Sequence, residues 1–389
     1  MGVLFLTPNW SAPSEVWIAR QIQALEGHVV AVGACDAPPA PGGGRIPALR
    51  LTNEPAPLWQ RVARRAGLPV TPVPTTAAAV VRRAVADEAV SVILVHYLDF
   101  ALRFEHVWRE MDKPVFVHPH GYDTEWDYRR REPPHGRYFP AEYPAAVRRL
   151  SAHVTLIANS RCVRQRLLDI GVPAGRVVLQ YYGIPSPPTC PVRARRSQDV
   201  HVLYLGRLVD CKGPDLVIQA FERACAAGLE GRLTLAGDGP LRGECERLVE
   251  QSPVAHRIRM IGAVDEAAAN RLRREADLFT AHNRRGPVTR QEESFGVAVV
   301  EAMAAGLPVV TGRSGGVCET VVGGETGYLI EPGDVAAHAA ALLRLGRDPE
   351  LRRRMGTAGW RRARAMFDCE RRWAELRRLL GVEAACAAP

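Results

Sequence analysis

The chain alternates short apolar runs with stretches in which apolar residues recur every three or four positions. The short runs predict buried β-strands, and the longer period predicts amphipathic helices. Strands that alternate with helices are typical of a parallel sheet with helices on both faces. In the first half of the chain, this pattern predicts a helix over 14–25 and strands over 3–7, 28–34, 90–97, 114–120, 153–160 and 176–183.

The segment 185–200 interrupts this alternation because it is rich in Pro and Arg and has no apolar period, as is typical of a linker. The alternation then resumes with a helix over 214–225 and strands over 201–206, 232–237, 257–262, 276–281, 307–312 and 326–330. We therefore predict an α/β fold of two Rossmann-like, doubly wound domains, 1–184 and 200–364, joined by a linker over 185–199.

The last part of the chain, 359–381, is a long basic stretch with a helical pattern. Its end, 365–381, either packs back on the first domain or forms an exposed terminal helix, and the pattern alone leaves both open. In open α/β sheets, ligands bind beyond the carboxyl ends of the strands. We therefore expect the functional site in the cleft between the two domains.

The composition is typical of a soluble folded protein and does not indicate a membrane protein or a metalloprotein. The 389 residues are 47% hydrophobic and 24% charged, as in a folded soluble protein. No run of about 18 apolar residues predicts a membrane span, and the first residues lack the pattern of a signal peptide, so we expect a cytoplasmic location. Nine cysteines without a CxxC pair and eleven histidines without an HExxH motif predict no metal or redox centre.

The net charge of +9 suits acidic partners such as nucleotides, phosphates or anionic lipid surfaces. Solvated, arginine-rich helix faces would explain the same charge. No motif in the chain predicts binding to nucleic acid.

One helix-like stretch, 292–310 (EESFGVAVVEAMAAGLPVV), is apolar almost all the way round and yet contains Glu301. A helix without a polar face is a buried helix, and an ionised carboxylate inside one is costly without a partner. Ser294 stands in the position of an N-cap, and Gly306 would end the helix. Glu293 therefore lies just before the predicted helix.

The start of this helix predicts a ligand site. The free amides of Phe295, Gly296 and Val297 carry partial positive charge, which suits a phosphate or a sugar hydroxyl. Carboxylates accept hydrogen bonds from vicinal diols, so Glu301 would hold a ribose and Glu293 a sugar ring. In this interpretation the ligand supplies the missing partner of Glu301. The alternative is an ion pair between Glu301 and an arginine inside the same domain.

The sequence around these residues resembles a motif of a known protein family. The seven-residue spacing between Glu293 and Glu301, within ESFGVAVVEAMAAGLPVV, is similar to the signature of the family 4 retaining glycosyltransferases. Other segments match that family in the same order: HGYD (120–123), IANSRCVRQRLLDIGVPAGRVVLQYYGI (157–184), LGRLVDCKGPDLVIQAF (205–221), LAGDGPLR (235–242), MIGAV (260–264) and GGVCETVVGGETGYLIEPGD (315–334). The resemblance covers residues 114–370 well and the first hundred residues weakly.

The resemblance implies a GT-B type enzyme, in which two Rossmann-like domains share a cleft and a nucleotide-diphospho-sugar is the donor, with no essential metal and no cofactor. It implies that Arg207 and Lys212 neutralise the donor pyrophosphate, where charge develops on the leaving group. It also implies that the donor lies along the backbone of Gly237, Gly239, Gly262 and Ala263. The alternatives are that Arg207 and Lys212 are solvated loop cations and that the glycines form ordinary tight turns.

In the first domain, the resemblance implies that His120 faces the transferred sugar or its leaving group, where it would donate a hydrogen bond or move a proton. Asp123 would orient His120 or contact the acceptor. Ser14 and Glu15 match the Ser-Glu start of the exopolysaccharide (colanic-acid-like) branch, so we expect them at the acceptor. The glycine loop that many relatives carry here is absent. Residues 122–144 are long, aromatic and basic, and we interpret them as a lid or an acceptor-binding loop, with a disordered insertion as the alternative.

The predicted function is the retaining transfer of a hexosyl group from a UDP- or GDP-sugar to an acceptor hydroxyl, in polysaccharide, glycoconjugate or secondary-metabolite biosynthesis. The alternatives are a sugar phosphorylase, a nucleotide-sugar epimerase or a non-catalytic nucleotide-sugar-binding protein. The expected partners are the donor and a carbohydrate, lipid-linked or small-molecule acceptor. The basic segments 352–356 and 371–380 would allow peripheral contact with the inner membrane, and solvated helix faces explain them equally well.

Overall fold

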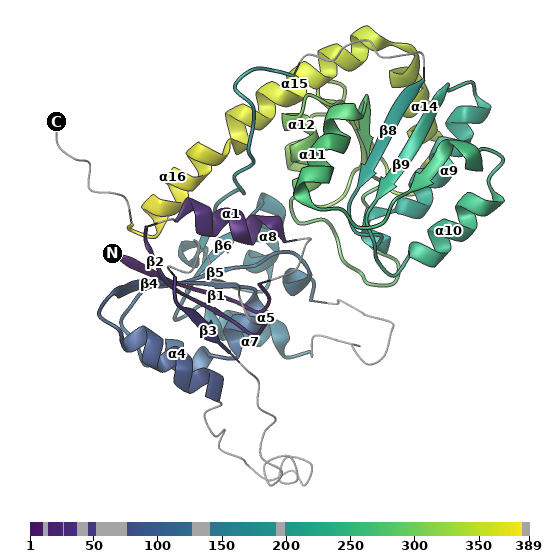
Figure 1. The fold of residues 1–389 in the computed structure, drawn as a ribbon. Helices are drawn as coiled ribbons and strands as arrows, with labels where there is room; N and C mark the ends of the chain where they lie inside the picture. The colour runs from purple at the N-terminus through teal and green to yellow at the C-terminus, as the bar shows by residue number, and fades with distance from the viewer. Residues whose placement is uncertain are drawn as a thin grey trace.

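The structure is a computed structural model, and it describes residues 1–10, 15–25, 27–36, 46–51, 76–126, 141–191 and 199–382. The chain folds into two units, each with its own parallel sheet, its own flanking helices and its own buried core (Figure 1). The predicted α/β fold with two Rossmann-like halves is confirmed.

The first sheet has seven strands in the order β3-β2-β1-β4-β5-β6-β7, and all pairs are parallel. Its strands are β1 (Gly2–Thr7), β2 (Val29–Ala34), β3 (Ala48–Arg50), β4 (Val90–His96), β5 (Val115–His118), β6 (Thr155–Ala158) and β7 (Val177–Leu179). Its helices are α1 (Val16–Ala24), α4 (Thr76–Ala86), α5 (Leu98–Leu102), α6 (Glu105–Trp108), α7 (Tyr143–Leu150) and α8 (Arg161–Asp169), with short 3-10 turns at Tyr122–Thr124 and Ala174–Arg176. The order reverses between β1 and β4, which makes this edge a ligand-binding position in such sheets.

The second sheet has six parallel strands in the order β10-β9-β8-β11-β12-β13. They are β8 (Val200–Leu205), β9 (Gly231–Ala236), β10 (Ile258–Met260), β11 (Leu278–Thr280), β12 (Val309–Gly312) and β13 (Gly327–Ile330). The helices are α9 (Pro214–Ala226), α10 (Arg242–Gln251), α11 (Glu266–Glu275), α12 (Val297–Ala304), α13 (Val317–Thr320) and α14 (Val335–Arg347), with 3-10 turns at Asp210–Lys212 and Ala255–Arg257.

Two C-terminal helices connect the domains again. Helix α15 (Pro349–Phe367) packs on α12, and α16 (Cys369–Leu379) continues towards the first domain (Figure 1). There Leu376, Leu380 and Val382 are part of the buried core of the first domain. The Arg377 guanidinium donates a hydrogen bond of 2.7 Å to the carbonyl of Ala24 at the end of α1. The end of the chain therefore packs back on the first domain.

The observed elements differ from the predicted ones mostly at their ends. Strand β5 stops at His118 because Pro119 follows, so His120 lies on a loop beyond the strand rather than at its end. Strand β3 was not predicted, and its three residues are largely exposed, so they show no apolar run. The helix that was predicted to begin after Ser294 begins at Val297 instead.

Candidate functional site

A cavity of about 410 Å³ lies between the two domains, at the carboxyl ends of β8 and β9 and against α1 of the first domain. It brings together most of the residues that the sequence singled out. The predicted site residues that line it are His120, Arg207, Lys212, Gly237, Ala263, Glu293, Ser294, Phe295, Val297 and Glu301. Both sheets thus present their carboxyl ends to one shared site, as open α/β sheets do.

Lys212 and Glu293 form the charged centre of the cavity. The Lys212 Nζ lies 2.7 Å from Glu293 Oε2, and the amide of Gly296 donates a 3.1 Å hydrogen bond to Glu293 Oε1. Burial by itself would raise the pKa of Glu293, but Lys212 and the nearby Arg207 outweigh burial and hold this pKa below its usual value. Glu293 is therefore an ionised acceptor of hydrogen bonds at neutral pH.

The backbone at the start of α12 is set by Gly296 rather than by Ser294. Gly296 is the N-cap residue with φ of 86°, in the left-handed region that glycine adopts most readily, and a Cβ there would lie 3.0 Å from the Val317 side chain. The Ser294 hydroxyl instead donates a 3.1 Å hydrogen bond to the carbonyl of His120 in the first domain. The prediction that Ser294 caps this helix is therefore wrong, because the helix begins at Val297 and Gly296 takes the N-cap position.

Glu301 faces the cavity and is already paired with two arginines. Its Oε2 accepts a 2.9 Å hydrogen bond from Arg273 on α11, and its Oε1 lies 2.7 Å from Nη2 of Arg20 on α1. Arg20 also contacts Glu266 at 2.8 Å. The expectation that a ligand alone supplies the partner of Glu301 is therefore wrong, since two guanidinium groups offset the cost of burying its charge.

The ion pair nevertheless leaves hydrogen-bonding capacity unused. Glu301 Oε1 and Arg20 Nη1 are both buried without an aligned hydrogen-bond partner. The contact between Arg20 and Glu301 also spans the two domains, because Arg20 lies on α1 and Glu301 on α12. The sequence-based alternative, an arginine from the same domain, describes Arg273 but not Arg20.

The glycines of the second domain bring backbone segments close together. Gly237 has φ of 152°, and a Cβ on it would lie 1.9 Å from the carbonyl oxygen of Gly206, so only glycine fits there. Its amide donates to the carbonyl of Gly262 at 2.7 Å. Gly237 and Ala263 line the cavity, whereas Gly239, Gly262 and Gly296 shape the backbone beside it without lining it.

His120 is held by hydrogen bonds at both ring nitrogens. Its Nδ1 bonds to the hydroxyl of Tyr182, and its Nε2 lies 2.7 Å from Nδ1 of His96. Burial, followed by the neighbouring His118 and His96, lowers the pKa of His120 well below its usual value. Nitrogen atoms of His96, His118 and His120 lie within 4.8 Å of one another. In this conformation both ring nitrogens of His120 take part in hydrogen bonds with protein side chains.

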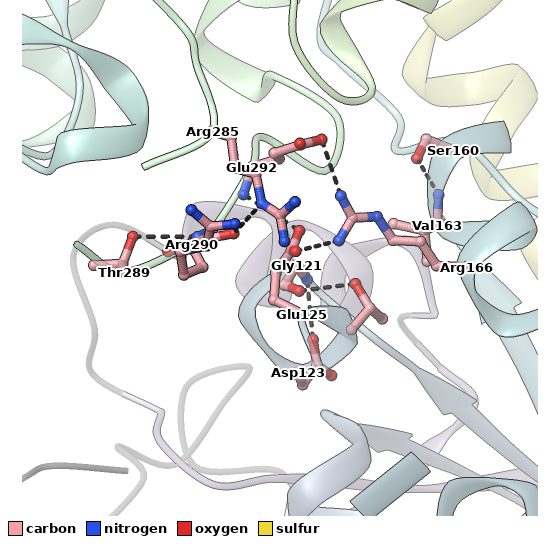
Figure 2. Close-up of polar contacts among 12 residues, drawn as sticks. Gly121, Asp123, Glu125, Ser160, Val163, Arg166, Arg285, Thr289, Arg290 and Glu292 are labelled. Atoms are coloured by element: carbon pink, nitrogen blue, oxygen red, sulfur yellow. Dashed lines mark hydrogen bonds and ion pairs between the residues drawn. The ribbon is translucent and has the colours of Figure 1, made fainter. Parts of the chain in front are cut away.

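Asp123 is fully buried and does not line the cavity. Its Oδ1 accepts hydrogen bonds from the amides of His120 (2.9 Å) and Gly121 (3.0 Å), and its Oδ2 accepts one from the amide of Leu98 (2.9 Å). Figure 2 shows the contact with Gly121. Burial and the neighbouring Asp99 raise the pKa of Asp123 to about 7, although these amides favour the carboxylate. In this conformation Asp123 shapes the backbone that carries His120 and has no exposed surface for an acceptor.

Glu15 lies at the start of α1, next to the cavity-lining Val16. The hydroxyl of Tyr97 donates a 2.6 Å hydrogen bond to its Oε1, and burial raises the pKa of Glu15. Its Oε2 is buried without a partner. Its predicted companion Ser14 lies outside the described residues, as does most of the 122–144 segment, so the acceptor roles of both remain predictions.

Further ion pairs and hydrogen bonds join the two domains next to the cavity-lining Glu292. Arg166 on α8 forms ion pairs with Glu125 of its own domain and, at 2.9 Å, with Glu292 of the second domain (Figure 2). The carboxylate of Glu319, from α13, accepts hydrogen bonds of 2.9 Å from the amides of Arg161 and Cys162 at the start of α8. The position of α8 relative to the second domain is thus set by charges from both sides.

Several cavity residues were missed by sequence reasoning. Trp17 and Arg20 are three positions apart on α1, so they share one helix face, and the polar Arg20 on a largely apolar helix was a usable signal. Glu266 and Arg273 share a face of α11 in the same way. His96 does not line the cavity but contacts His120, and the sequence offered only its position at the end of a strand. Tyr182 lines the cavity, and nothing in its sequence context indicated a role.

The buried His118 makes stability depend on pH. Burial lowers its pKa to about 3, whereas an unfolded histidine titrates near 6.5. Between these values the unfolded chain binds a proton that the folded chain does not, so this group lowers the free energy of unfolding as pH falls from about 6.5 to 3, by up to about 1.4 kcal/mol per pH unit. Asp123 acts in the opposite direction, because its raised pKa favours the folded state as pH falls from about 7.

We therefore expect the wild type to lose stability relative to His118→Gln as pH is lowered from 7 to 5. Comparing the two proteins by urea unfolding at each pH cancels the contribution of Asp123. Parallel pH profiles for the two proteins would contradict this assignment.

Two family models match the chain. The glycosyl transferase 4-like domain matches residues 16–183, and glycosyl transferases group 1 matches residues 191–362. The first match covers the first sheet except β1, and the second covers the whole second sheet. The chain belongs to the family 4 glycosyltransferases.

Curated relatives in this glycosyltransferase family match part of the chain. It is 32% identical to the GDP-mannose-dependent alpha-(1-6)-phosphatidylinositol monomannoside mannosyltransferase of Mycolicibacterium smegmatis over 179 residues, or 46% of this chain and 47% of the relative. It is 28% identical to the amylovoran biosynthesis glycosyltransferase AmsK of Erwinia amylovora over 205 residues, or 52% and 49%. The chain thus spans about half the length of these relatives.

Solved structures resemble this chain over nearly its whole length. Anabaena Alr3699/HepE in complex with UDP has a TM-score of 0.75 and 19% identity, covering 98% of this chain and 100% of that one. Sucrose-phosphate synthase from Thermosynechococcus elongatus has a TM-score of 0.73 and 20% identity, covering 97% and 98%. These likenesses show the fold, the GT-B arrangement of two Rossmann-like domains. Within the described part of the chain, no helix combines the length and apolarity that crossing a bilayer requires.

Proposed function

We propose that this protein is a retaining glycosyltransferase that moves a hexosyl group from a UDP- or GDP-sugar to an acceptor hydroxyl, without a metal. The observation that carries the proposal is the cavity itself. It joins two cations, Arg207 and Lys212, and two carboxylates, Glu293 and Glu301, at the carboxyl ends of the second sheet. Such a set matches the charges and diols of a nucleotide-diphospho-sugar.

Each part of the donor has a complementary group. The pyrophosphate lies against Arg207 and Lys212, whose positive charge takes the place that a divalent cation holds in other transferases. The ribose diol donates to Glu301, whose Oε1 lacks an aligned hydrogen bond. The base lies beside Ala263, and the sugar hydroxyls donate to the ionised Glu293. The direct neighbour of Glu293 is Lys212, so the sugar and the pyrophosphate meet at this pair.

The reaction proceeds on the front face of the sugar. The acceptor oxygen forms its bond to the anomeric carbon on the side from which the nucleotide leaves, and the acceptor proton passes to the leaving phosphate. Lys212 and Arg207 stabilise the charge that develops on this phosphate. Glu293 binds the donor sugar and forms no covalent bond to it. Closure of the two domains excludes water, which would otherwise hydrolyse the donor.

The acceptor is a carbohydrate, a lipid-linked saccharide or a small molecule, held by the first domain near Glu15. The relatives include a phosphatidylinositol monomannoside mannosyltransferase and an amylovoran biosynthesis glycosyltransferase, and the first of these names supports a saccharide-containing acceptor. We place the reaction in the cytoplasm, with peripheral contact at the inner membrane when the acceptor is lipid-linked.

Donor binding and turnover are tested separately. We expect one of UDP-glucose, GDP-mannose and related donors to raise the melting temperature, because a ligand that binds only the folded state stabilises it. With that donor, nucleotide release should rise on addition of a matching acceptor, and the product should keep the donor's anomeric configuration and form equally well in EDTA. Stabilisation by a donor without release for any acceptor would identify a binding protein instead. Release that requires inorganic phosphate would identify a phosphorylase.

A further inference from the structure

Three aromatic rings in the first domain form a flat chain that ends at the cavity. The planes of His120 and Tyr182 lie within 3° of each other, and those of His96 and His120 within 10°. The His96 and His120 nitrogens are 2.7 Å apart, which is too close for rings stacked face to face. The rings therefore meet edge to edge, and both hydrogen bonds of His120 lie near the plane of its imidazole.

This geometry suits a neutral imidazole, which donates through one nitrogen and accepts through the other. The Tyr182 hydroxyl in turn accepts a 3.0 Å hydrogen bond from Nδ2 of Asn159. The same Asn159 amide lies 3.4 Å from the Ser294 hydroxyl, which donates to the carbonyl of His120. These hydrogen bonds thus connect His120 with the segment that carries Glu293 in the other domain.

Resting on the glycosyl transfer proposed above, we propose that His96 and Tyr182 are positioning residues, which hold His120 as a permanently neutral and immobile imidazole. His120 then carries no proton between acceptor and donor. Its ring fixes the loop 120–124 and, through the Ser294 contact, the start of the donor site. This assignment leaves the donor phosphate as the group that receives the acceptor proton.

The charged and titratable surroundings of His120 favour this state. They are His96, His118, Tyr97, Tyr182 and Asp123 in the first domain, and Lys212 and Glu293 on the far wall of the cavity. The side-chain hydroxyl of Tyr97 is hydrogen-bonded to Glu15, and the Asp123 carboxylate faces backbone amides. Neither of these carboxylates is hydrogen-bonded to the His120 ring to stabilise an imidazolium.

The test combines substitutions at His96 and Tyr182 with an NMR measurement of the protonation state of the His120 ring. The side-chain amide of asparagine can take the place of the histidine Nδ1, so His96→Asn should keep kcat within about 3-fold. His96→Phe and Tyr182→Phe each remove one hydrogen bond of His120 and should lower kcat by about 10- to 100-fold through misplacement, with donor KM changed less than 3-fold. Nitrogen-15 NMR of histidine-labelled protein should show His120 neutral from pH 8 to 5 in the wild type. In the two Phe variants, one ring nitrogen of His120 loses its hydrogen-bond partner, so the nitrogen-15 shifts should change from those of a single tautomer to those of a mixture of both neutral tautomers.

A second buried histidine pair provides the control. His282 and His338 in the second domain are joined by a 2.7 Å hydrogen bond between their Nδ1 atoms, with ring planes 16° apart. His338→Phe should lower the melting temperature and leave kcat and its pH profile as in the wild type.

The proposal is overturned if His120 titrates between pH 6 and 7 in the wild type, or if His96→Asn loses as much activity as His96→Phe. The NMR result decides it even if no acceptor supports transfer, so its failure can be told from failure of the proposed function.

Discussion

Replacing Lys212 by methionine should reduce kcat by about 100- to 1000-fold, the size of effect seen when one preorganised donor to a developing oxyanion is removed. Lys212 lies 2.7 Å from Glu293 in a largely buried position, where a charge interacts more strongly than it would in water. Methionine keeps most of the unbranched side chain and removes the ammonium group, with its charge and its N–H donors. The affinity for the bare nucleoside, which lacks phosphates, should stay within a few-fold of the wild type.

The matched control is Lys113→Met, the same change at a lysine of the first domain. The Lys113 ammonium donates hydrogen bonds to the carbonyls of Val85 (2.6 Å) and Asp87 (2.7 Å), away from the cavity. We expect its kcat to stay within about 3-fold of the wild type. Steady-state kinetics with saturating donor measures both variants, and equal kcat values for Lys212→Met and the wild type would exclude the leaving-group role.

The second large effect concerns Glu301. If Glu301 holds the ribose, Glu301→Gln should weaken nucleotide binding by about 10- to 100-fold, because hydrogen bonds to a charged group contribute about 1.5 to 3 kcal/mol. The same change leaves Arg20 and Arg273 with one fewer counter-charge, so it should also lower stability by about 3 kcal/mol or more. Calorimetry on the folded variant at low temperature separates the two effects.

The control is Asp215→Asn, which breaks an ion pair of similar burial in the same domain. Asp215 accepts two hydrogen bonds from Arg284, at 3.0 and 2.8 Å, and does not line the cavity. The Asp215→Asn variant should be less stable than the wild type but should bind the nucleotide with the same affinity. Should Glu301→Gln behave in the same way, with lower stability and unchanged affinity, Glu301 would be a structural partner of the two arginines and no ribose ligand.

Arg20 connects these predictions to domain closure. Its guanidinium reaches from the first domain to Glu301 and Glu266 of the second, so it favours the closed arrangement when no donor is bound. A ribose that binds Glu301 must share this carboxylate with Arg20. Donor binding and closure are therefore coupled through one side chain that the sequence did not single out.

Much of the fold could be predicted because the relevant signals are local. Apolar runs located the strands of both sheets to within a few residues, apart from the short β3. Gly306, with φ of 73° and its amide bonded to the carbonyl of Met303, ends α12 as predicted. The error at Ser294 has a different origin. Its sequence context favours a cap, but the helix begins only at Val297 behind Gly296, and the Ser294 hydroxyl donates to the carbonyl of His120 in the other domain.

The amino-acid sequence by itself thus determined the two-domain α/β architecture, the Glu293–Glu301 spacing and the placing of cations after a strand, since each depends on residues close together in the chain. Only the tertiary structure decided which charges meet. Arg20 with Glu301, Asn159 with Ser294 and His120 with Tyr182 are separated by long stretches of chain, and no local period encodes such pairs. The partners of a buried polar group depend on how two independently formed domains close on each other, and that is a property of the packed molecule.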